Sequence, residues 1–418
     1  MNPFTSHTLA SLAQTHGTPL WVYDASTIEC QVAALRSFDV IRFAQKANSN
    51  THILKLMKRL GVQVDSVSLG EIERALAAGF KPGLHNGHAE IVFTADLLDR
   101  STLPRVAELG IPVNCGSIDM LDQLAAASPG HPVWLRINPG FGHGHSNKTN
   151  TGGEHSKHGI WHTDLPLALE RVRAKGLTLI GLHMHIGSGV DYAHLQEVCG
   201  AMVALVQTVK AQGMDVQAIS AGGGLSIPYR AGDVPIDPAH YFSLWDAARA
   251  QIASLLAHPV TLEIEPGRYL VAESGVLVSE VRATKQMGAN PFVLVDAGFS
   301  DLMRPSMYGS FHGMELIHAD GTSATGALQD TVVGGPLCES GDVFTQGEGG
   351  VVQKRPLPVA QVGDLLVLHD AGAYGASMSS NYNTRPLIPE VLLEGGLPRL
   401  IRRKQTVAEL LALESIDD

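Results

Sequence analysis

The feature that most constrains the fold is a unit that recurs eight times between residues 40 and 267. In each unit, a short run of β-branched and apolar residues ends in small or polar residues, and a stretch with helical periodicity follows. The runs are 40–47, 62–69, 90–95, 111–117, 133–139, 177–187, 216–224 and 261–267. Strands that alternate with helices form parallel sheets, and eight such units are the number that closes a (β/α)8 barrel. The pattern predicts a TIM-like barrel, and the alternative is an open doubly wound sheet, because periodicity does not reveal closure.

The sequence changes character after residue 267. Strand-like runs at 275–284, 292–295, 331–333 and 365–369 are separated by Gly, Pro and Asp turns, and helical periodicity returns only at 406–413. We therefore predict an α/β protein with a barrel over residues 25–267 and a mainly β domain over 268–418, joined by residues 1–24. With 418 residues, of which 44% are hydrophobic, the chain is long enough for two such cores.

Charge and cysteine content argue against several classes of protein. The net charge of −11 disfavours nucleic-acid binding, because phosphates require a basic face. The four cysteines are scattered and form no C-x-x-C pair, which suits a reducing cytoplasm rather than a disulfide framework or a zinc finger. The N-terminus lacks a secretory pattern, and no apolar stretch is long enough to span a bilayer. We therefore expect a cytoplasmic protein that binds neither nucleic acid nor membrane.

Residues with chemical potential stand where the predicted strands end, which is the face on which such barrels place their sites. Lys46 ends the first run, Asp65 lies in the second, and His185 and Glu265 end the sixth and eighth. A carboxylate facing a pyridine nitrogen would keep that nitrogen protonated, although Glu265 could instead pair with Arg268. A solvated Lys46 and a structural His185 are the corresponding alternatives.

The seventh run ends in Gly222, Gly223 and Gly224. Without Cβ atoms, such a triplet lets backbone N–H groups approach a phosphate, but it can equally form a tight turn. Arg268 favours the phosphate interpretation, because it adds a cation beside the triplet. The polar stretch 141–159 contains four histidines without the spacing of a metal site. We therefore predict no metal and interpret this stretch as a lid over the substrate.

Two short sequences in the predicted β domain also favour function. Cys338-Glu339-Ser-Gly-Asp342 follows Gly-Gly-Pro, and Gly-Ala-Tyr374-Gly comes later. A lone cysteine is more often a buried apolar residue, but a loop between turn-forming residues and acids suits a functional residue better than packing.

Taken in order, eight short sequences resemble the diaminopimelate decarboxylases, a family of barrel-type (fold type III) pyridoxal-phosphate decarboxylases. The resemblance extends from about residue 20 to residue 413. The sequences are Phe-Ala-Gln-Lys46-Ala-Asn, Asp65-Ser-Val-Ser-Leu-Gly-Glu-Ile, His183-Met-His185-Ile-Gly-Ser188-Gly, Gly222-Gly-Gly224, Glu265-Pro-Gly-Arg268-Tyr, Asp296-Ala-Gly-Phe-Ser-Asp-Leu-Met-Arg304-Pro-Ser-Met-Tyr308, Cys338-Glu339-Ser-Gly-Asp342 and Gly372-Ala-Tyr374-Gly375.

The resemblance implies decarboxylation of meso-2,6-diaminopimelate to L-lysine and CO₂, the last step of lysine biosynthesis, by a homodimer with shared active sites. Lys46 matches the lysine that forms a Schiff base with pyridoxal 5′-phosphate, and His185 matches the residue stacked on its ring. Cys338 matches the acid that protonates the carbanion left after CO₂ release, offered by the partner subunit. The other residues matching cofactor contacts are Asp65, Ser188, Gly222, Gly223, Gly224, Glu265, Pro266, Gly267, Arg268 and Tyr374. Those matching substrate contacts are Arg268, Arg304, Tyr308, Glu339 and Tyr374.

The substrate has a carboxylate and an ammonium group at its distal end, which Arg304 and Glu339 can pair with. Three stretches depart from the family's pattern: Phe-Thr-Ala-Asp at 93–96, Ser300 where Asn is expected, and an insertion at 84–88. A barrel amino-acid racemase, a polyamine-pathway decarboxylase and a cofactor-binding regulator without turnover remain as alternative functions.

Overall fold

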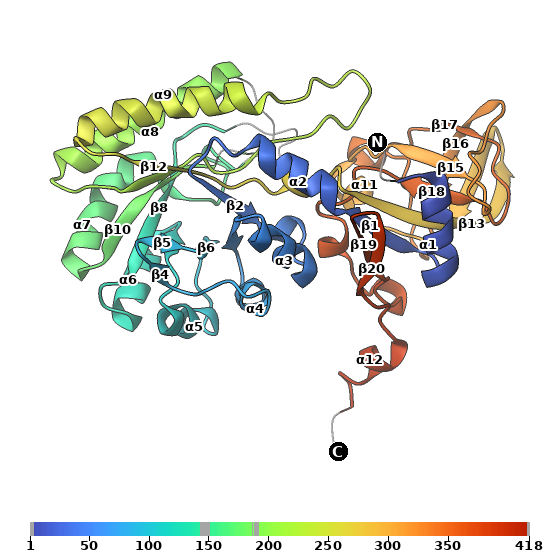
Figure 1. The fold of residues 1–418 in the computed structure, drawn as a ribbon, viewed down its shortest axis with the longest axis horizontal. Helices are drawn as coiled ribbons and strands as arrows, with labels where there is room; N and C mark the ends of the chain where they lie inside the picture. Colours follow the sequence, from blue (N-terminus) through green and yellow to red (C-terminus); the bar gives the residue numbers. More distant parts are fainter. Residues whose placement is uncertain (1–3, 143–150, 186, 188–191, 416–418) are drawn as a thin grey trace. The chain divides into compact units, whose positions relative to one another are not determined.

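The computed structural model describes residues 4–142, 151–185, 187 and 192–415, and Figure 1 traces the chain. The chain forms two compact units. The barrel unit comprises Gln31–Ser226 and Pro235–Tyr269, and the sheet unit comprises Met1–Cys30, Ile227–Val234 and Leu270–Asp418. The short segment Ile227–Val234 therefore groups with the sheet unit, a feature absent from the predicted division. The domain bounds 25–267 and 268–418 themselves stay a prediction.

Eight parallel strands of the barrel unit follow the predicted order. They are β2 (Val40–Ala44), β3 (Gln63–Ser66), β6 (Ile91–Ala95), β7 (Val113–Cys115), β8 (Pro132–Asn138), β10 (Thr178–His183), β11 (Ala218–Ser220) and β12 (Thr261–Ile264). The last of these strands, β12, pairs with the first, β2, and β8 pairs with β10. The sheet therefore closes, which confirms the predicted (β/α)8 barrel and excludes the open sheet. A short strand, β9 (Ile160–Trp161), extends β8 on one side.

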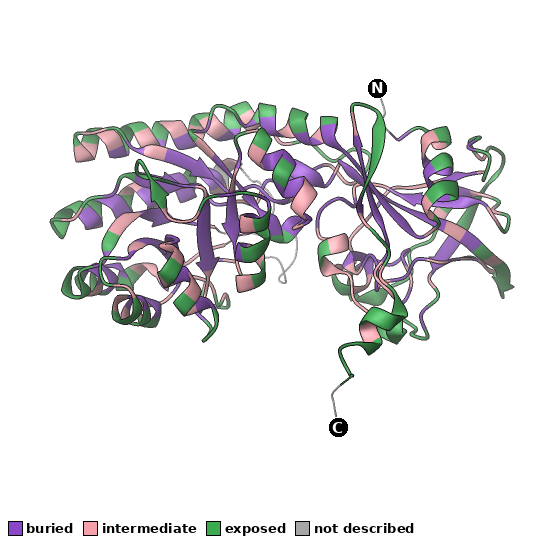
Figure 2. Cartoon of the chain, turned by 60° about the horizontal axis from the view of Figure 1, so that its bottom comes forward, coloured by how far each residue is buried: buried purple, intermediate pink, exposed green. Residues whose placement is uncertain are grey.

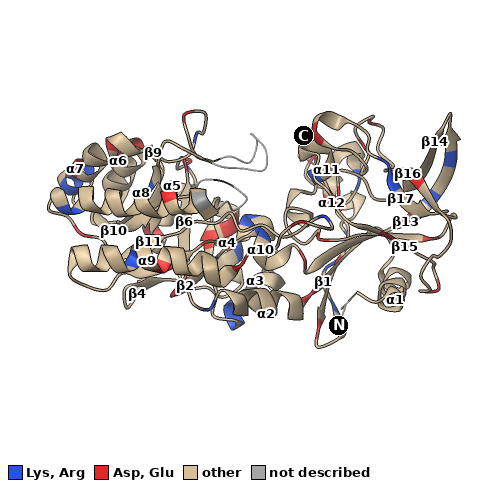
Figure 3. Ribbon diagram, turned by 90° about the horizontal axis from the view of Figure 1, so that it is seen from above, with Lys and Arg blue, Asp and Glu red and all other residues tan. Residues whose placement is uncertain are grey.

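Helices alternate with the strands of the barrel and cover their outer side (Figure 1). Polar caps fix where several of them begin: Asn50, Ser68, Ser117 and Asp237 each accept hydrogen bonds from backbone N–H groups of the first turn. Figure 2 shows buried strands inside and exposed outer faces on these helices, and Figure 3 shows acidic and basic residues interspersed over them. The helices are α2 (Ala25–Ala34), α3 (Thr51–Arg59), α4 (Leu69–Ala77), α5 (Thr102–Leu109), α6 (Ile118–Ala127), α7 (Leu165–Lys175), α8 (Tyr192–Ala211) and α9 (Pro238–Leu256).

The sheet unit is mainly β, as predicted. Its strands are β1 (Leu20–Asp24), β13 (Gly275–Met287), β14 (Asn290–Val295), β15 (Met314–Ile317), β16 (Leu328–Gly334), β17 (Arg355–Pro358), β18 (Leu365–Leu368), β19 (Glu390–Glu394) and β20 (Leu397–Arg402). The N-terminal strand β1 is fully buried and pairs with β13 on one side and β19 on the other. The helix α1 (Ser6–His16) buries its apolar residues in the same core. Short helices α10 (Arg268–Val271), α11 (Arg304–Tyr308) and α12 (Val407–Leu411) follow later in the chain.

The insertion at 84–88 forms an exposed hairpin of β4 (Leu84–His85) and β5 (His88–Ala89). Its turn, Asn86-Gly87, has φ values of 54° and 81°. Asn-Gly is the pair that best tolerates two consecutive positive φ angles, so local turn chemistry accounts for this departure. Within the described ranges, no helix combines the length and apolarity needed to cross a bilayer. The same ranges contain no group of three or more His, Cys, Asp or Glu side chains arranged to hold a metal ion.

Candidate active site

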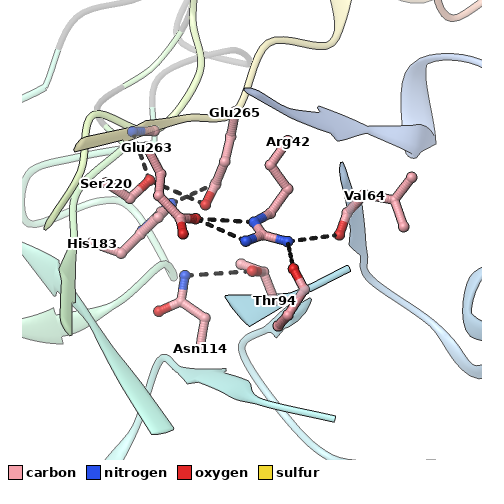
Figure 4. Close-up of polar contacts among 10 residues, drawn as sticks. Arg42, Val64, Thr94, Asn114, His183, Ser220, Glu263 and Glu265 are labelled. Atoms are coloured by element: carbon pink, nitrogen blue, oxygen red, sulfur yellow. Dashed lines mark hydrogen bonds and ion pairs between the residues drawn. The ribbon is translucent and has the colours of Figure 1, made fainter. Parts of the chain in front are cut away.

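Glu265 follows β12, and side chains from the two preceding strands fix its carboxylate (Figure 4). Glu265 Oε2 lies 2.7 Å from His183 Nε2, and Oε1 accepts a hydrogen bond of 3.1 Å from Ser220 Oγ. Burial by itself raises the pKa of Glu265, but the charge and hydrogen bond of His183 outweigh burial, so the pKa lies below its usual value. Glu265 is therefore a buried anion whose orientation is set by β10 and β11.

A second buried carboxylate, Glu263, lies two residues earlier on β12 and so faces the same side of the strand. Glu263 Oε2 accepts hydrogen bonds of 3.1 and 2.9 Å from Nε and Nη2 of Arg42 on β2. Arg42 Nη1 also donates to the carbonyl oxygen of Val64 at 3.5 Å (Figure 4). The same nitrogen donates to the carbonyl oxygen of Ala89 at 3.1 Å. This ion pair joins the first and last barrel strands directly beneath the site.

Asp65 on β3 is 3% exposed, and among the described residues its Oδ1 has no hydrogen-bond partner. Burial and then the negative charge of Glu265 raise the pKa of Asp65 well above its usual value, while Lys46 and a hydrogen bond with Thr94 act in the opposite direction. Two buried carboxylates thus stand close enough to affect each other's ionisation. Such a pair suits a ligand that brings a positive charge or an N–H donor.

Lys46 lies in a single 3-10 turn, η1 (Gln45–Ala47), immediately after β2, and its side chain is exposed. Its charge acts on both Asp65 and His185, which places it at the same end of the barrel. His185 Nδ1 accepts a hydrogen bond of 3.2 Å from Gly223 N. Burial, helped by the charges of Arg136 and Lys46, lowers the pKa of His185 well below its usual value. His185 is therefore a neutral ring with a fixed orientation.

The glycine triplet packs between the ends of the neighbouring strands. A Cβ atom would lie 2.2 Å from Met184 O at Gly222, 2.5 Å from Glu265 O at Gly223 and 2.3 Å from Gly187 O at Gly224. Gly222 and Gly224 also have positive φ angles, of 62° and 102°. The backbone therefore requires all three glycines for close approach, whatever ligand binds there, and their phosphate role stays a prediction. Ser188 lies outside the described residues.

The described ends of the 141–159 stretch are tied to the barrel. Asn138 at the end of β8 accepts a hydrogen bond from Gly153 N at 2.9 Å and donates to His158 O at 3.2 Å. His158 Nδ1 lies 2.5 Å from Asp96 Oδ2, so the unfamiliar third-strand end has a defined partner. Residues 143–150 lie outside the described part of the chain, and the lid stays a prediction.

In the sheet unit, Arg304 begins α11 and is 4% exposed, and Tyr308 ends the same helix. Arg304 Nη1 lies 3.0 Å from His312 Nε2, and its guanidinium carbon lies 4.9 Å from the centre of the Tyr229 ring. The arginine is thus held in place by two aromatic side chains, one of which comes from the segment Ile227–Val234.

Cys338 and Glu339 are both exposed on a loop that Asp342 organises. The buried carboxylate of Asp342 accepts hydrogen bonds from Leu337 N at 2.8 Å and Phe299 N at 2.7 Å. Burial raises the pKa of Asp342, and these two hydrogen bonds oppose the rise. Asp342 therefore stabilises the backbone of the loop. The side chains of Cys338 and Glu339 on this loop remain exposed to solvent.

This loop is also tied to α11, because Ser306 Oγ donates to Gly341 O at 2.8 Å. Gln346 Nε2 lies 3.0 Å from the same two oxygens. Tyr374, by contrast, lies on a separate turn and has a φ of 57°, which is unusual for a bulky residue. Ser300, where Asn was expected, is 1% exposed.

The predicted site residues are therefore divided between the two units. The barrel unit brings together Lys46, Asp65, His185, Gly222, Gly223, Gly224, Glu265, Pro266, Gly267 and Arg268. The sheet unit contains Arg304, Tyr308, Cys338, Glu339 and Tyr374. The sequence reasoning missed the residues that hold these groups: Arg42, Glu263, His183, Ser220, Tyr229, Ser306 and His312. Three of them carried a signal, since His183, Ser220 and Glu263 each lie on a strand two positions before a predicted site residue.

Comparisons with known proteins give a consistent result. The family described as pyridoxal-dependent decarboxylase, pyridoxal binding domain, matches residues 26–272. The diaminopimelate decarboxylase of Escherichia coli (strain K12) is 66% identical over 411 residues, which cover 98% of this chain and 97% of the relative. A crystal structure of a diaminopimelate decarboxylase, 64% identical, superposes with a TM-score of 0.95 and covers 100% of this chain and 98% of that one. The Helicobacter pylori diaminopimelate decarboxylase complexed with L-lysine, 31% identical, has a TM-score of 0.85 and covers 97% of this chain and 98% of that one.

Proposed function

The chain belongs to the diaminopimelate decarboxylase family, and on that premise we propose which of its residues bind the cofactor, bind the substrate and move the proton. The reaction is the decarboxylation of meso-2,6-diaminopimelate, a small amino acid, to L-lysine and CO₂. Because meso-diaminopimelate has one D and one L centre and the product is L-lysine, the carboxylate that leaves is that of the D centre. The carboxylate of the L centre survives, and the enzyme must bind it without reacting with it.

We propose that pyridoxal 5′-phosphate binds at the mouth of the barrel. Three observations fit this cofactor: a buried Asp65 oxygen that has no hydrogen-bond partner among the described residues, the ionised Glu265 whose charge acts on Asp65, and a glycine triplet where no Cβ can stand. When bound, the cofactor accepts the electrons that carbon dioxide leaves behind on the substrate. Glu265 would hold a proton on the pyridine nitrogen, and the Lys46 amine would take the place of the aldehyde oxygen, which leaves as water. The single observation that carries this assignment is that Asp65 and Glu265 are both buried and interact electrostatically with each other.

The remaining cofactor contacts that we propose are those implied by the family resemblance. His185 would stack on the cofactor ring, and its hydrogen bond with Gly223 N supports this role by holding the imidazole in place. Gly222, Gly223, Gly224, Ser188 and Arg268 bind the phosphate. Asp65, Pro266, Gly267 and Tyr374 complete the contacts with the cofactor.

For the substrate, we propose that Arg304 binds the surviving carboxylate and Glu339 binds the ammonium group beside it. Arg304 is buried and held in one orientation, as recognition of a planar carboxylate requires. Arg268, Tyr308 and Tyr374 bind the rest of the substrate. An ornithine-type substrate has no distal carboxylate, so this arginine accounts for the selectivity.

We further propose that the protein is a homodimer in which Cys338 of one subunit donates the proton at the other subunit's site. Its exposure, on a loop fixed by Asp342, supports such a role. Mixing the inactive variants Lys46→Ala and Cys338→Ala tests it. Shared sites predict recovery of about a quarter of the wild-type activity, because half of the random dimers regain one site. If each site used only its own Cys338, mixing would restore nothing.

The proposed chemistry as a whole is tested by two measurements on the purified enzyme with pyridoxal phosphate. Carbon dioxide release should occur from meso-diaminopimelate and not from ornithine, arginine or alanine. Borohydride reduction followed by peptide mapping should label Lys46. A label on another lysine would overturn the site assignment while leaving the activity in place.

We also propose that the protein works in the cytoplasm. All four cysteines are free, and burial raises the pKa of Cys115 and Cys199. Free thiols persist in a reducing compartment.

A further inference from the structure

We infer that His312 is a positioning residue that orients Arg304 toward the surviving carboxylate of the substrate, an assignment that rests on the proposed role of Arg304. A guanidinium on a long side chain has many rotamers, and it binds a carboxylate well only when one of them is held in advance. Arg304 stands on a helix of five residues, so the helix alone does little to hold it. The contacts that fix Arg304 therefore determine how well it can bind.

Both ring nitrogens of His312 are engaged, and the two partners define its state. His312 Nδ1 lies 2.9 Å from the carbonyl oxygen of His369, which can only accept a hydrogen bond, so Nδ1 carries the hydrogen. His312 Nε2 lies 3.0 Å from Arg304 Nη1, which can only donate, so Nε2 presents its lone pair. His312 is therefore a neutral imidazole in a single tautomer.

A neutral acceptor has a specific advantage at this position. A carboxylate there would hold Arg304 equally well, but it would also compensate the positive charge that the substrate needs. The imidazole of His312 fixes Nη1 without adding a negative charge of its own beside the guanidinium. A histidine at this position thus orients Arg304 and does not weaken the attraction of Arg304 for an anion.

The imidazole is itself anchored in the sheet unit. His312 is 2% exposed, and the backbone N–H of His369, directly after β18, donates to Gly313 O at 2.9 Å. The ring of Tyr229 lies under the Arg304 guanidinium and meets the His312 ring edge-on, with ring centres 5.9 Å apart at 81°. Tyr229 belongs to Ile227–Val234, which begins three residues after Gly224. The chain that forms the glycine triplet thus continues into a support for the arginine.

Two substitutions separate the two hydrogen bonds of His312. In His312→Gln, the side-chain amide oxygen can take the place of Nε2 and still accept from Arg304. In His312→Asn, the shorter amide can take the place of Nδ1 and still donate to His369, but it cannot reach Arg304. Both variants lose the imidazole, so a difference between them reports the contact with Arg304 rather than the loss of the ring.

The readout is the ratio of two inhibition constants measured on the holoenzyme. L-lysine retains the carboxylate that Arg304 binds, whereas cadaverine is the same diamine without it. We expect His312→Asn to raise the inhibition constant of L-lysine roughly 10-fold or more and to leave that of cadaverine unchanged, because a hydrogen bond to a charged group is lost. His312→Gln should remain near the wild type. The KM for meso-diaminopimelate should rise in His312→Asn more than kcat falls.

Control variants make each result decisive. Arg304→Gln should abolish the preference for L-lysine, and if it does not, the proposed role of Arg304 is wrong. If Arg304→Gln abolishes the preference but a folded His312→Asn retains it, the inference about His312 falls alone. His318→Asn, a histidine of the same unit that pairs with Asp364, should keep the wild-type ratio. Should His312→Asn fail to fold, His312→Gln still decides, because a folded His312→Gln without the preference overturns the inference.

Discussion

The buried pair of Arg42 and Glu263 offers a sharp test of how the barrel is closed beneath its site. The two residues are 221 positions apart in the sequence and 2% and 7% exposed. Arg42→Met removes one charge and leaves Glu263 buried without its partner. Removal of one member of a buried ion pair typically costs about 3–5 kcal/mol of the free energy of unfolding.

The double variant Arg42→Met, Glu263→Leu removes both charges, so the cost of an unpaired buried charge disappears. In the wild type, the carbonyl oxygen of Ala89 lies 3.1 Å from Arg42 Nη1. The double variant leaves this oxygen without that donor. Losing a partner for one buried polar group costs about 1–3 kcal/mol. We therefore expect the double variant to be less stable than the wild type by about 1–3 kcal/mol, and so more stable than Arg42→Met by about 2 kcal/mol.

Urea unfolding followed by far-UV circular dichroism measures these differences, provided that the slope with denaturant is unchanged. The matched control is Arg105→Met, which breaks the surface pairs of Arg105 with Glu73 and Glu108; the three side chains are 32%, 49% and 66% exposed. That change should cost about 1 kcal/mol or less. A double variant no more stable than Arg42→Met, or an Arg42→Met protein as stable as the control, would refute the reasoning.

Three further changes probe the site and a helix start. Glu265→Gln should weaken pyridoxal-phosphate binding roughly 10- to 150-fold, because a charged partner becomes neutral; an absorbance titration that finds unaltered affinity would contradict the assignment. Both carboxylate oxygens of Asp342 accept hydrogen bonds from backbone N–H groups. Asp342→Asn replaces one of these oxygens with an NH₂ group, which cannot accept, so the loop that carries Cys338 should become more mobile. Thiol labelling of Cys338 should then become faster and kcat should fall, and unchanged values of both would exclude the role of Asp342. Hydrogen bonds lower the pKa of Asp99 from 3.8 to about 2, and the largest contribution comes from the side chain of Ser101. Because the folded pKa is the lower one, the stabilisation is complete above about pH 4 and is lost as the pH falls toward about 2. Asp99→Asn should therefore lower the urea midpoint at about pH 6 and change it less at about pH 2.5, and an equal effect at both would be inconsistent with this shift.

The sequence by itself determined the features that depend on neighbouring residues along the chain, namely the barrel strands and the residues at their ends. A strand that alternates with a helix leaves a periodic signature, and all eight barrel strands lie within or overlap their predicted runs. Lys46, Glu265 and the glycine triplet were identifiable because they stand at the ends of such runs. The hairpin at 84–88 was not predicted, although Asn86-Gly87 is a local signal that could have indicated it.

The tertiary structure alone decided what depends on pairs of residues far apart in the sequence. Closure of the barrel requires β12 to pair with β2, and β1 acquires its place between β13 and β19 only when the sheet assembles. The contact between Arg304 and His312 and the ionisation of Asp65 and Glu265 likewise have no local signature. Burial and charge act through space, so a carboxylate in a sequence has no defined pKa until folding sets its neighbours.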